Sequence, residues 1–242
     1  QLNLQSNGEL NISGSGEYTG DIALAGGKFS AVDDQELSGT LSVTADSELS
    51  VASGYILELS QDGGLSLGAN TLTLSGGGNL ESGGLTLNDA DSKLLLNSIT
   101  VDSVSTSADN SGLDVDNDST VTSLTVAHTT PVSIASTKTL SGAITVSGGS
   151  IQLDETGTLA SSVSMSGGTL DADNSSTVSG TLSQSGNITI DVASGKTLSY
   201  SGASLSLDNN TLTLSGEGRL SNSNALVLNN ASSKLLLSNS IT

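Results

Sequence analysis

The sequence contains no cysteine, no tryptophan and a single proline, and only 6 Lys and Arg residues stand against 25 Asp and Glu. The lack of cysteine excludes disulfide bonds, thiol chemistry and cysteine-based zinc sites. The net charge of −19 argues against nucleic acid and anionic membrane surfaces as partners, because both are bound through Lys and Arg. No run of about 18 apolar residues is present, so the sequence predicts no transmembrane helix and no membrane insertion.

Aromatic residues are also scarce, at 2% of the chain. A compact domain of this size normally places more aromatic rings in its core. We therefore expect a thin core built from Leu, Val, Ile and Ala. Few charges and abundant Gly, Ser, Thr and Asn would favour disorder if the apolar residues did not follow a regular pattern.

That pattern is a strict alternation, in which two apolar residues flank one polar residue and the motif recurs about every seven to nine residues. A spacing of two places both apolar side chains on one face of a β-strand. The turns between the motifs are rich in Gly, Asn, Ser and Asp. We expect side chains to point inward at Leu72, Leu74, Ile188, Ile190, Leu212 and Leu214, and outward at Thr73 and Thr213.

Strands this short favour an all-β fold, a parallel β-helix or β-solenoid, over a sandwich of hairpins, whose strands are usually longer. About three short strands would make one coil of roughly 20–25 residues, which predicts roughly ten coils for this chain. Connections between parallel strands are normally right-handed, so we expect a right-handed solenoid.

A long internal repeat supports this prediction. The stretch from Asn70 to Thr100 recurs from Asn210 to Thr242, and only single-residue slips separate the two copies. We interpret residues 1–242 as a single solenoid, with 1–100 the end of one block of about 140 residues and 101–242 a second block. The chain begins and ends inside the repeat pattern, so we expect it to be a fragment of a longer protein.

Two Asp-rich segments are candidate metal sites. Acids alternate at Asp114, Asp116 and Asp118, and the pattern is echoed at Asp171 and Asp173. The first segment resembles the start of an EF-hand loop, but the required glycine and the final acid of that loop are absent. The five residues therefore predict either an irregular calcium site or solvated Asx turns. No other cofactor is expected.

Three further patterns leave alternatives open. Thr71-x-Thr73 and Thr211-x-Thr213 resemble the threonine arrays of ice-binding solenoids, although such arrays need threonine in coil after coil. Three consecutive leucines at 94–96 and at 235–237 indicate either a bend at a solenoid corner or a lateral self-contact. The single histidine, His128, has no evident catalytic partner, and no phosphate loop, nucleophile elbow or HExxH motif is present. We therefore expect no enzyme activity.

The phrases SGTLS, NTLTLSGGG and SGG-x-L resemble the β-solenoid stalks of large bacterial surface adhesins, including autotransporter passengers and filamentous-haemagglutinin-like exoproteins. The resemblance lies in composition and architecture along the whole chain, and it carries over no functional residue. It implies a right-handed helix, secretion, and a role in adhesion, biofilms or filaments.

The resulting hypothesis is an extracellular stalk at the bacterial cell surface, which presents a binding tip. The alternative is a module that binds carbohydrate or ice on one flat face of the solenoid. The expected partners are other repeats of the same parent protein, stacked end to end, and host or matrix glycans.

Overall fold

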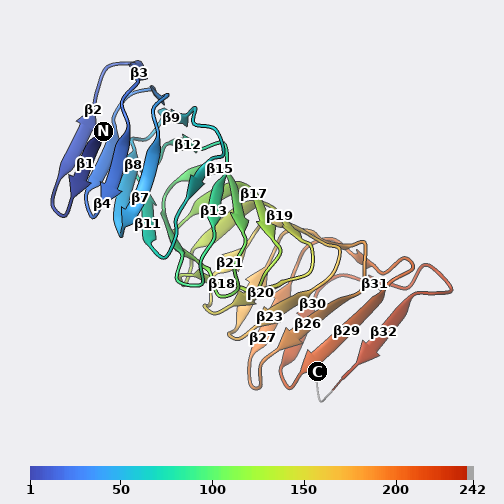
Figure 1. Cartoon of the computed structure of the whole chain (residues 1–242). Coiled ribbons are helices and arrows are strands. Elements are labelled where there is room, and N and C mark those ends of the chain that lie inside the picture. Colours follow the sequence, from blue (N-terminus) through green and yellow to red (C-terminus); the bar gives the residue numbers. More distant parts are fainter. Residues whose placement is uncertain (239–242) are drawn as a thin grey trace. The chain divides into compact units, whose positions relative to one another are not determined.

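The computed structural model describes residues 1–238, and every regular element in that range is a β-strand (Figure 1). The strands fall into two compact units, residues 1–123 and 124–242. In each unit the chain winds through successive coils, and parallel ladders join the strands of neighbouring coils. The expected continuation of the solenoid at Ser240, Ile241 and Thr242 lies outside the described residues.

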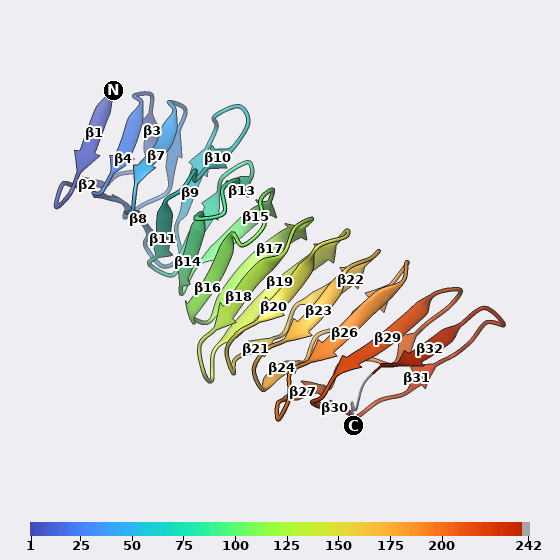
Figure 2. The same cartoon turned by 60° about the horizontal axis from the view of Figure 1, so that its bottom comes forward.

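Each coil of the first unit contributes a strand to up to three faces, called A, B and C in chain order (Figure 2). Face A holds β1 (Leu2–Gln5), β4 (Ile22–Ala25), β7 (Leu41–Ala45), β10 (Leu65–Ser66) and β13 (Leu85–Leu87). Face B holds β2 (Glu9–Ile12), β5 (Lys28–Ala31), β8 (Ser47–Val51), β11 (Thr71–Ser75), β14 (Lys93–Asn97) and β16 (Gly112–Asn117). Face C holds β3 (Gly16–Tyr18), β6 (Gln35–Leu37), β9 (Ile56–Leu59), β12 (Asn79–Glu81) and β15 (Thr100–Thr106). The next strand, β17 (Ser119–Val126), contains the boundary between the units.

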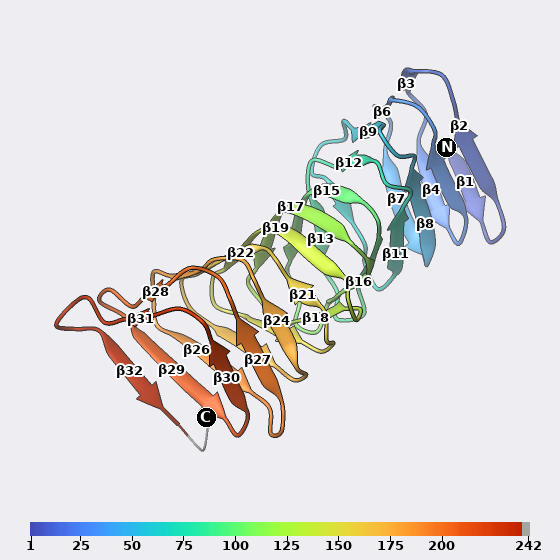
Figure 3. The same cartoon turned by 180° about the vertical axis from the view of Figure 1, so that it is seen from behind.

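The second unit repeats this arrangement (Figure 3). Face B holds β18 (Thr130–Ile134), β20 (Ser150–Leu153), β23 (Thr169–Ala172), β26 (Ile188–Val192), β29 (Thr211–Gly216) and β32 (Lys234–Leu237). Face C holds β19 (Thr139–Val146), β21 (Thr158–Leu159), β24 (Ser176–Val178), β27 (Thr197–Tyr200) and β30 (Arg219–Asn222). Face A holds β22 (Ser162–Met165), β25 (Leu182–Gln184), β28 (Leu205–Ser206) and β31 (Leu226–Val227).

The β-solenoid predicted from the sequence is confirmed, with six face-B strands in each unit and about 12 turns in total. The count exceeds the expected ten because most coils are short. Leu94 pairs with Leu113 and Ile151 pairs with Leu170, so the chain returns to the same face sooner than the expected coil length allows.

The lumen of the coils is aliphatic, as expected. All six residues predicted to point inward are buried, whereas Thr73 and Thr213 are partly exposed on the outer side of face B. Phe29 and Tyr200 are the buried aromatic residues of the described chain. Burial of a Leu or Ile side chain contributes roughly 1.5–3 kcal/mol, and the alternation supplies such side chains in every coil.

Glycine allows the coils to stack closely at several turns. Gly168 has a φ of +84°, and a Cβ atom added to it would clash with the backbone carbonyl of Gly149 in the preceding coil. Both the backbone angle and the close approach therefore require glycine at this position.

The leucine triplets do not mark a bend at a solenoid corner, and that interpretation is wrong. Leu95 lies in the middle of the strand β14 and points outward between Thr73 and Asp114 of the neighbouring coils. Leu236 occupies the corresponding place on β32, in register with Thr213, and is 51% exposed.

In each unit, one coil contains more residues than most of the other coils. Leu49 pairs with Leu74 in the first unit, and Ile190 pairs with Leu214 in the second, so several more residues separate these partners than in a short coil. Faces B and C stay paired across each long coil, through β8 with β11, β9 with β12, β26 with β29 and β27 with β30. Face A does not: within the described residues no ladder joins β7 to β10 or β25 to β28. We call these two interruptions the face-A seams.

Candidate functional site

A polar groove of about 470 Å³ lies beside face B of the first unit. It follows the turns that lead into four successive face-B strands. Its lining consists of Asn7, Gly8, Glu9, Gly26, Gly27, Lys28, Asp46, Ser47, Glu48, Thr71 and Thr73. The groove contains hydroxyl, amide and charged groups but no aromatic ring.

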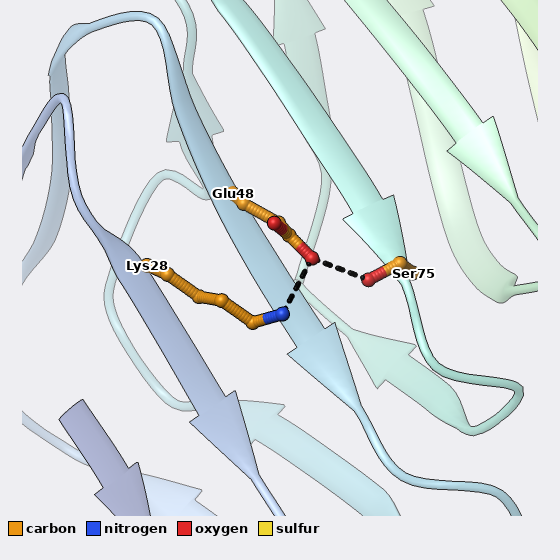
Figure 4. Close-up of polar contacts among 3 residues, drawn as sticks. All are labelled: Lys28, Glu48 and Ser75. Atoms are coloured by element: carbon orange, nitrogen blue, oxygen red, sulfur yellow. Dashed lines mark hydrogen bonds and ion pairs between the residues drawn. The ribbon is translucent and has the colours of Figure 1, made fainter. Parts of the chain in front are cut away.

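Two residues of this lining, Lys28 and Glu48, form an ion pair (Figure 4). Lys28 on β5 and Glu48 on β8 are in register, and Lys28 Nζ lies 2.8 Å from Glu48 Oε1. Ser75 Oγ on β11 donates to the same carboxylate oxygen at 2.9 Å. Three consecutive coils therefore contribute to one hydrogen-bonded cluster.

The cluster keeps the Glu48 carboxyl ionised. Burial raises the pKa of Glu48, but the hydrogen bonds from Lys28 and Ser75 and the positive charge of Lys28 together outweigh it, so the net pKa lies below the usual value. The groove thus presents a compensated ion pair among hydroxyl groups. The lining also holds the carboxylates of Glu9 and Asp46. It can donate and accept hydrogen bonds, and it suits a neutral polar or cationic ligand better than an anionic one.

The structure places the five predicted calcium ligands in two different units. Asp114 lies on β16, where its Oδ2 is 2.5 Å from Lys93 Nζ on β14, whereas Asp116 and Asp118 are exposed. In the described residues, no group of three or more His, Cys, Asp or Glu side chains is arranged so that it could hold a metal ion. The ion pair with Lys93 was not foreseen, because the two residues lie a full coil apart in the sequence.

Asp171 and Asp173 belong to an acidic environment in the second unit. Asp171 on β23 is in register with Gln152 on β20 and with Asp191 on β26. Burial, followed by the charges of Asp173, Asp191 and Asp154, raises the pKa of Asp171 to about 6, against a hydrogen bond with Gln152 that acts to lower it. Asp191 in turn accepts a hydrogen bond from Ser215 Oγ on β29.

A second acidic feature was missed by the sequence analysis. Four glutamates stand in register on consecutive face-C strands of the first unit. Figure 3 labels these strands, β3, β6, β9 and β12. They are Glu17, Glu36, Glu58 and Glu81, and Asp102 occupies the following position on β15. Ser38 Oγ and Ser60 Oγ donate to the carboxylates of Glu17 and Glu36 from the next coil. The signal in the sequence was the recurrence of an acid at intervals of one coil.

No family model, no curated protein and no solved structure matches the chain. Among the described residues, no helix is long and apolar enough to cross a membrane.

Proposed function

We propose that this chain is an extracellular structural stalk of a bacterial surface protein, which holds a binding tip of its parent away from the cell. The observation that carries the proposal is the stacking of coils within each unit, in which parallel ladders on at least two faces connect each coil to the next. Each coil advances the stack by about 4.8 Å. Such a stack gives length from a simple repeated sequence, and one block of the design recurs after about 140 residues.

Other features support a structural role. The lumen is filled with aliphatic side chains, and the outward positions carry mostly small polar or acidic residues. A strongly acidic surface favours solubility and discourages non-specific association at low salt. We propose that the chain performs no catalysis and that its natural neighbours are further repeats of the same parent.

Surface display tests this proposal. The chain would be placed between a bacterial surface anchor and a binding module of known ligand, and compared with a Gly/Ser linker of equal length. We expect adhesion to ligand-coated beads to be stronger with the solenoid, because a flexible linker allows the module to fall back towards the cell surface. The chain without the module should not adhere. Adhesion by the chain alone, or equal adhesion with both spacers, would contradict a stalk role.

The second candidate function is carbohydrate binding, which the polar groove on face B favours. A glycan array probed with the wild-type chain and with Lys28→Ala tests it, since the substitution removes the cation of the groove lining. Host or matrix glycans are the proposed ligands. Loss of a glycan signal in the variant would support this role, and the absence of any signal would count against it.

Ice binding has weaker support. Face B of the second unit does carry a column of hydroxyls at Ser150, Thr169, Thr189 and Thr213. The adjacent outward column holds Asp171 and Asp191, however, and their charges interrupt the flat threonine surface that an ice-binding face needs. An ice-affinity assay distinguishes this role from the carbohydrate role.

A further inference from the structure

An apolar patch interrupts the polar surface of the first unit at the corner between faces B and C. Val32 directly follows β5 on one coil, and Tyr55 and Ile56 stand at the start of β9 on the next; their exposed fractions are 39%, 38% and 38%. A hydrogen bond of 2.9 Å from Ile56 N to Asp34 Oδ1 joins the two turns. In residues 1–238 the other exposed large apolar side chains belong to the first and last coils: Leu2, Leu228, Leu236 and Leu237. Apolar side chains that gather on the outside of interior coils indicate a contact surface.

The four glutamates in register, which we call the glutamate column, border this patch. Ile56 and Glu58 stand two residues apart on β9, so both side chains point outward on face C. From Glu58 the column runs to Glu36 and Glu17 on the preceding coils and to Glu81 on the following one. The corner and the face beside it therefore combine an apolar anchor with a row of negative charges.

The two basic side chains of the first unit do not compensate this row of charges. Lys28 and Lys93 both lie on face B, where they pair with Glu48 and Asp114. The carboxylates of the glutamate column stand one coil apart, about 4.8 Å, and like charges directly opposite each other on neighbouring strands are destabilising. A cationic partner would relieve this repulsion, whereas an anionic partner would increase it.

In its described part, the second unit carries neither feature. At the positions of the glutamate column it has hydroxyl side chains in register: Thr158, Thr177, Ser199 and Ser221. At the three positions of the apolar patch, the repeat places polar residues instead: Asp173, Lys196 and Thr197. The patch and the column thus occur together in one copy of the repeat and are replaced together in the other. Because the second unit stacks its coils without them, they are not needed for stacking.

The spacing of the column fits a helix better than an extended strand. A helix that lies along the column returns to the same face after one turn, about 5.4 Å, whereas a strand does so after about 6.8 Å. Over the three steps from Glu17 to Glu81, the mismatch with the coil spacing is about 2 Å for the helix and about 6 Å for the strand. Long Lys and Arg side chains can absorb the smaller mismatch, because their stems are flexible.

We propose that face C of the first unit docks a basic amphipathic helix of a partner protein. One stripe of Lys or Arg on the helix faces the glutamate column, and an adjoining apolar stripe covers Val32, Tyr55 and Ile56. The apolar contact supplies most of the affinity, and the charges steer and orient the partner. A neutral saccharide would leave the column uncompensated, and a polyamine would leave the patch exposed.

Fluorescence anisotropy with the whole chain tests the proposal. The probe is a fluorescein-labelled helical peptide of about 18 residues of Lys, Leu and Ala, with Lys on one stripe and Leu on the adjoining stripe, long enough to span the column. We expect saturable binding that weakens as the salt concentration rises. A peptide with Glu in place of every Lys should not bind. Spermine, which has cations but no apolar stripe, should compete only weakly.

Two variants and two matched controls locate the contact. Tyr55→Ser/Ile56→Thr removes most of the apolar patch without a change of charge and should weaken binding about tenfold, whereas Leu236→Thr, at an exposed leucine of the second unit, should leave it unchanged. Glu58→Gln removes one charge of the column and should weaken binding about threefold. Glu9→Gln removes one exposed charge from face B of the same unit and should have no effect.

Carboxyl labelling with a carbodiimide shows where the peptide binds. The bound peptide should protect Glu36 and Glu58 and leave the labelling of Glu155 and Glu217, which are exposed on the second unit, unchanged. If a variant unfolds, the labelling pattern of the wild-type chain decides alone.

Several results would overturn the proposal. These are the absence of saturable binding, protection that falls elsewhere, or equal weakening by Glu58→Gln and Glu9→Gln. Binding that Tyr55→Ser/Ile56→Thr leaves intact would show attraction by net charge alone. Binding of neutral oligosaccharides that the same double substitution abolishes would assign the corner to sugars. None of these outcomes depends on whether the chain serves as a stalk.

Discussion

Replacement of Asp171 by Asn is expected to stabilise the second unit at neutral pH. Asp171 lies among acids on both sides: Asp191 faces it from β26, Asp154 follows the strand β20, and Asp173 is on its own chain segment. Burial and these three negative charges raise the pKa of its carboxyl from 3.8 to about 6. Asparagine keeps the shape of the side chain and its capacity to bond with Gln152, and it removes the charge.

The size and sign of the effect of Asp171 on the free energy of unfolding follow from its pKa values in the unfolded and the folded chain. In the unfolded chain the carboxyl ionises near 3.8, whereas in the folded chain it holds its proton up to about 6. Folding is therefore favoured at low pH, and stability is lost as the pH rises from about 4 to about 6. The full difference between these two pKa values corresponds to at most about 3 kcal/mol of unfolding free energy. Asp171 is partly exposed, so solvent screening reduces this to about 1 kcal/mol.

Thermal unfolding at pH 4 and pH 7.5, at constant ionic strength, measures this effect. Asp171→Asn should raise the melting temperature of the second unit by about 3 °C at pH 7.5 and by almost nothing at pH 4. Glu217→Gln is the matched control, because it removes one negative charge from a position on the outside of the same unit. An equal gain at both pH values, or an equal gain from the control, would show that the reasoning about Asp171 is wrong.

Three further predictions concern the core, the glutamate column and calcium. Leu212→Asp buries a charge in the apolar lumen and should cost several kcal/mol of unfolding free energy, whereas Thr213→Asp at the adjacent outward position should cost much less; equal shifts in denaturant midpoint would contradict the assignment of the two faces. Glu58→Lys places a cation between Glu36 and Glu81, so it should raise the melting temperature by about 1–2 °C in low salt. In about 1 M salt the gain should vanish because the charges are screened, and a gain that persists there would contradict an electrostatic cause. Calcium binding at Asp114, Asp116 and Asp118 stays a prediction: it requires a higher melting temperature in millimolar calcium than in matched magnesium, and identical melting in both would contradict it.

The fold was predictable because the alternating pattern is nearly uninterrupted. Leu72, Leu74, Leu212 and Leu214 stand in pairs with one residue between them, and a register error of one residue would have exposed them all. The prediction of the number of coils was less accurate, since coil length depends on how many residues each turn contains. Turns rich in Gly, Asn and Ser accept several lengths, and the composition does not reveal which one is adopted.

The contacts between coils were not predictable to the same degree. Lys28 and Glu48, like Lys93 and Asp114, are partners that lie one coil apart in the sequence. Such pairs become visible only when the length of each coil is known to the residue, because each extra turn residue shifts all later outward positions. The same uncertainty hid the column that contains Glu36 and Glu58, although every member was present in the sequence.

The longer coil in each unit also has a consequence for cooperativity. In a stack of this kind each coil is stabilised mainly by its neighbours, so loss of structure spreads from coil to coil. At most steps three ladders must break together, but at the β7–β10 and β25–β28 steps only those of faces B and C remain. Each unit therefore contains one step at which neighbouring coils are coupled less strongly. Partial unfolding within a unit should begin or stop at that step, and the rest of its coils should stay folded as a block.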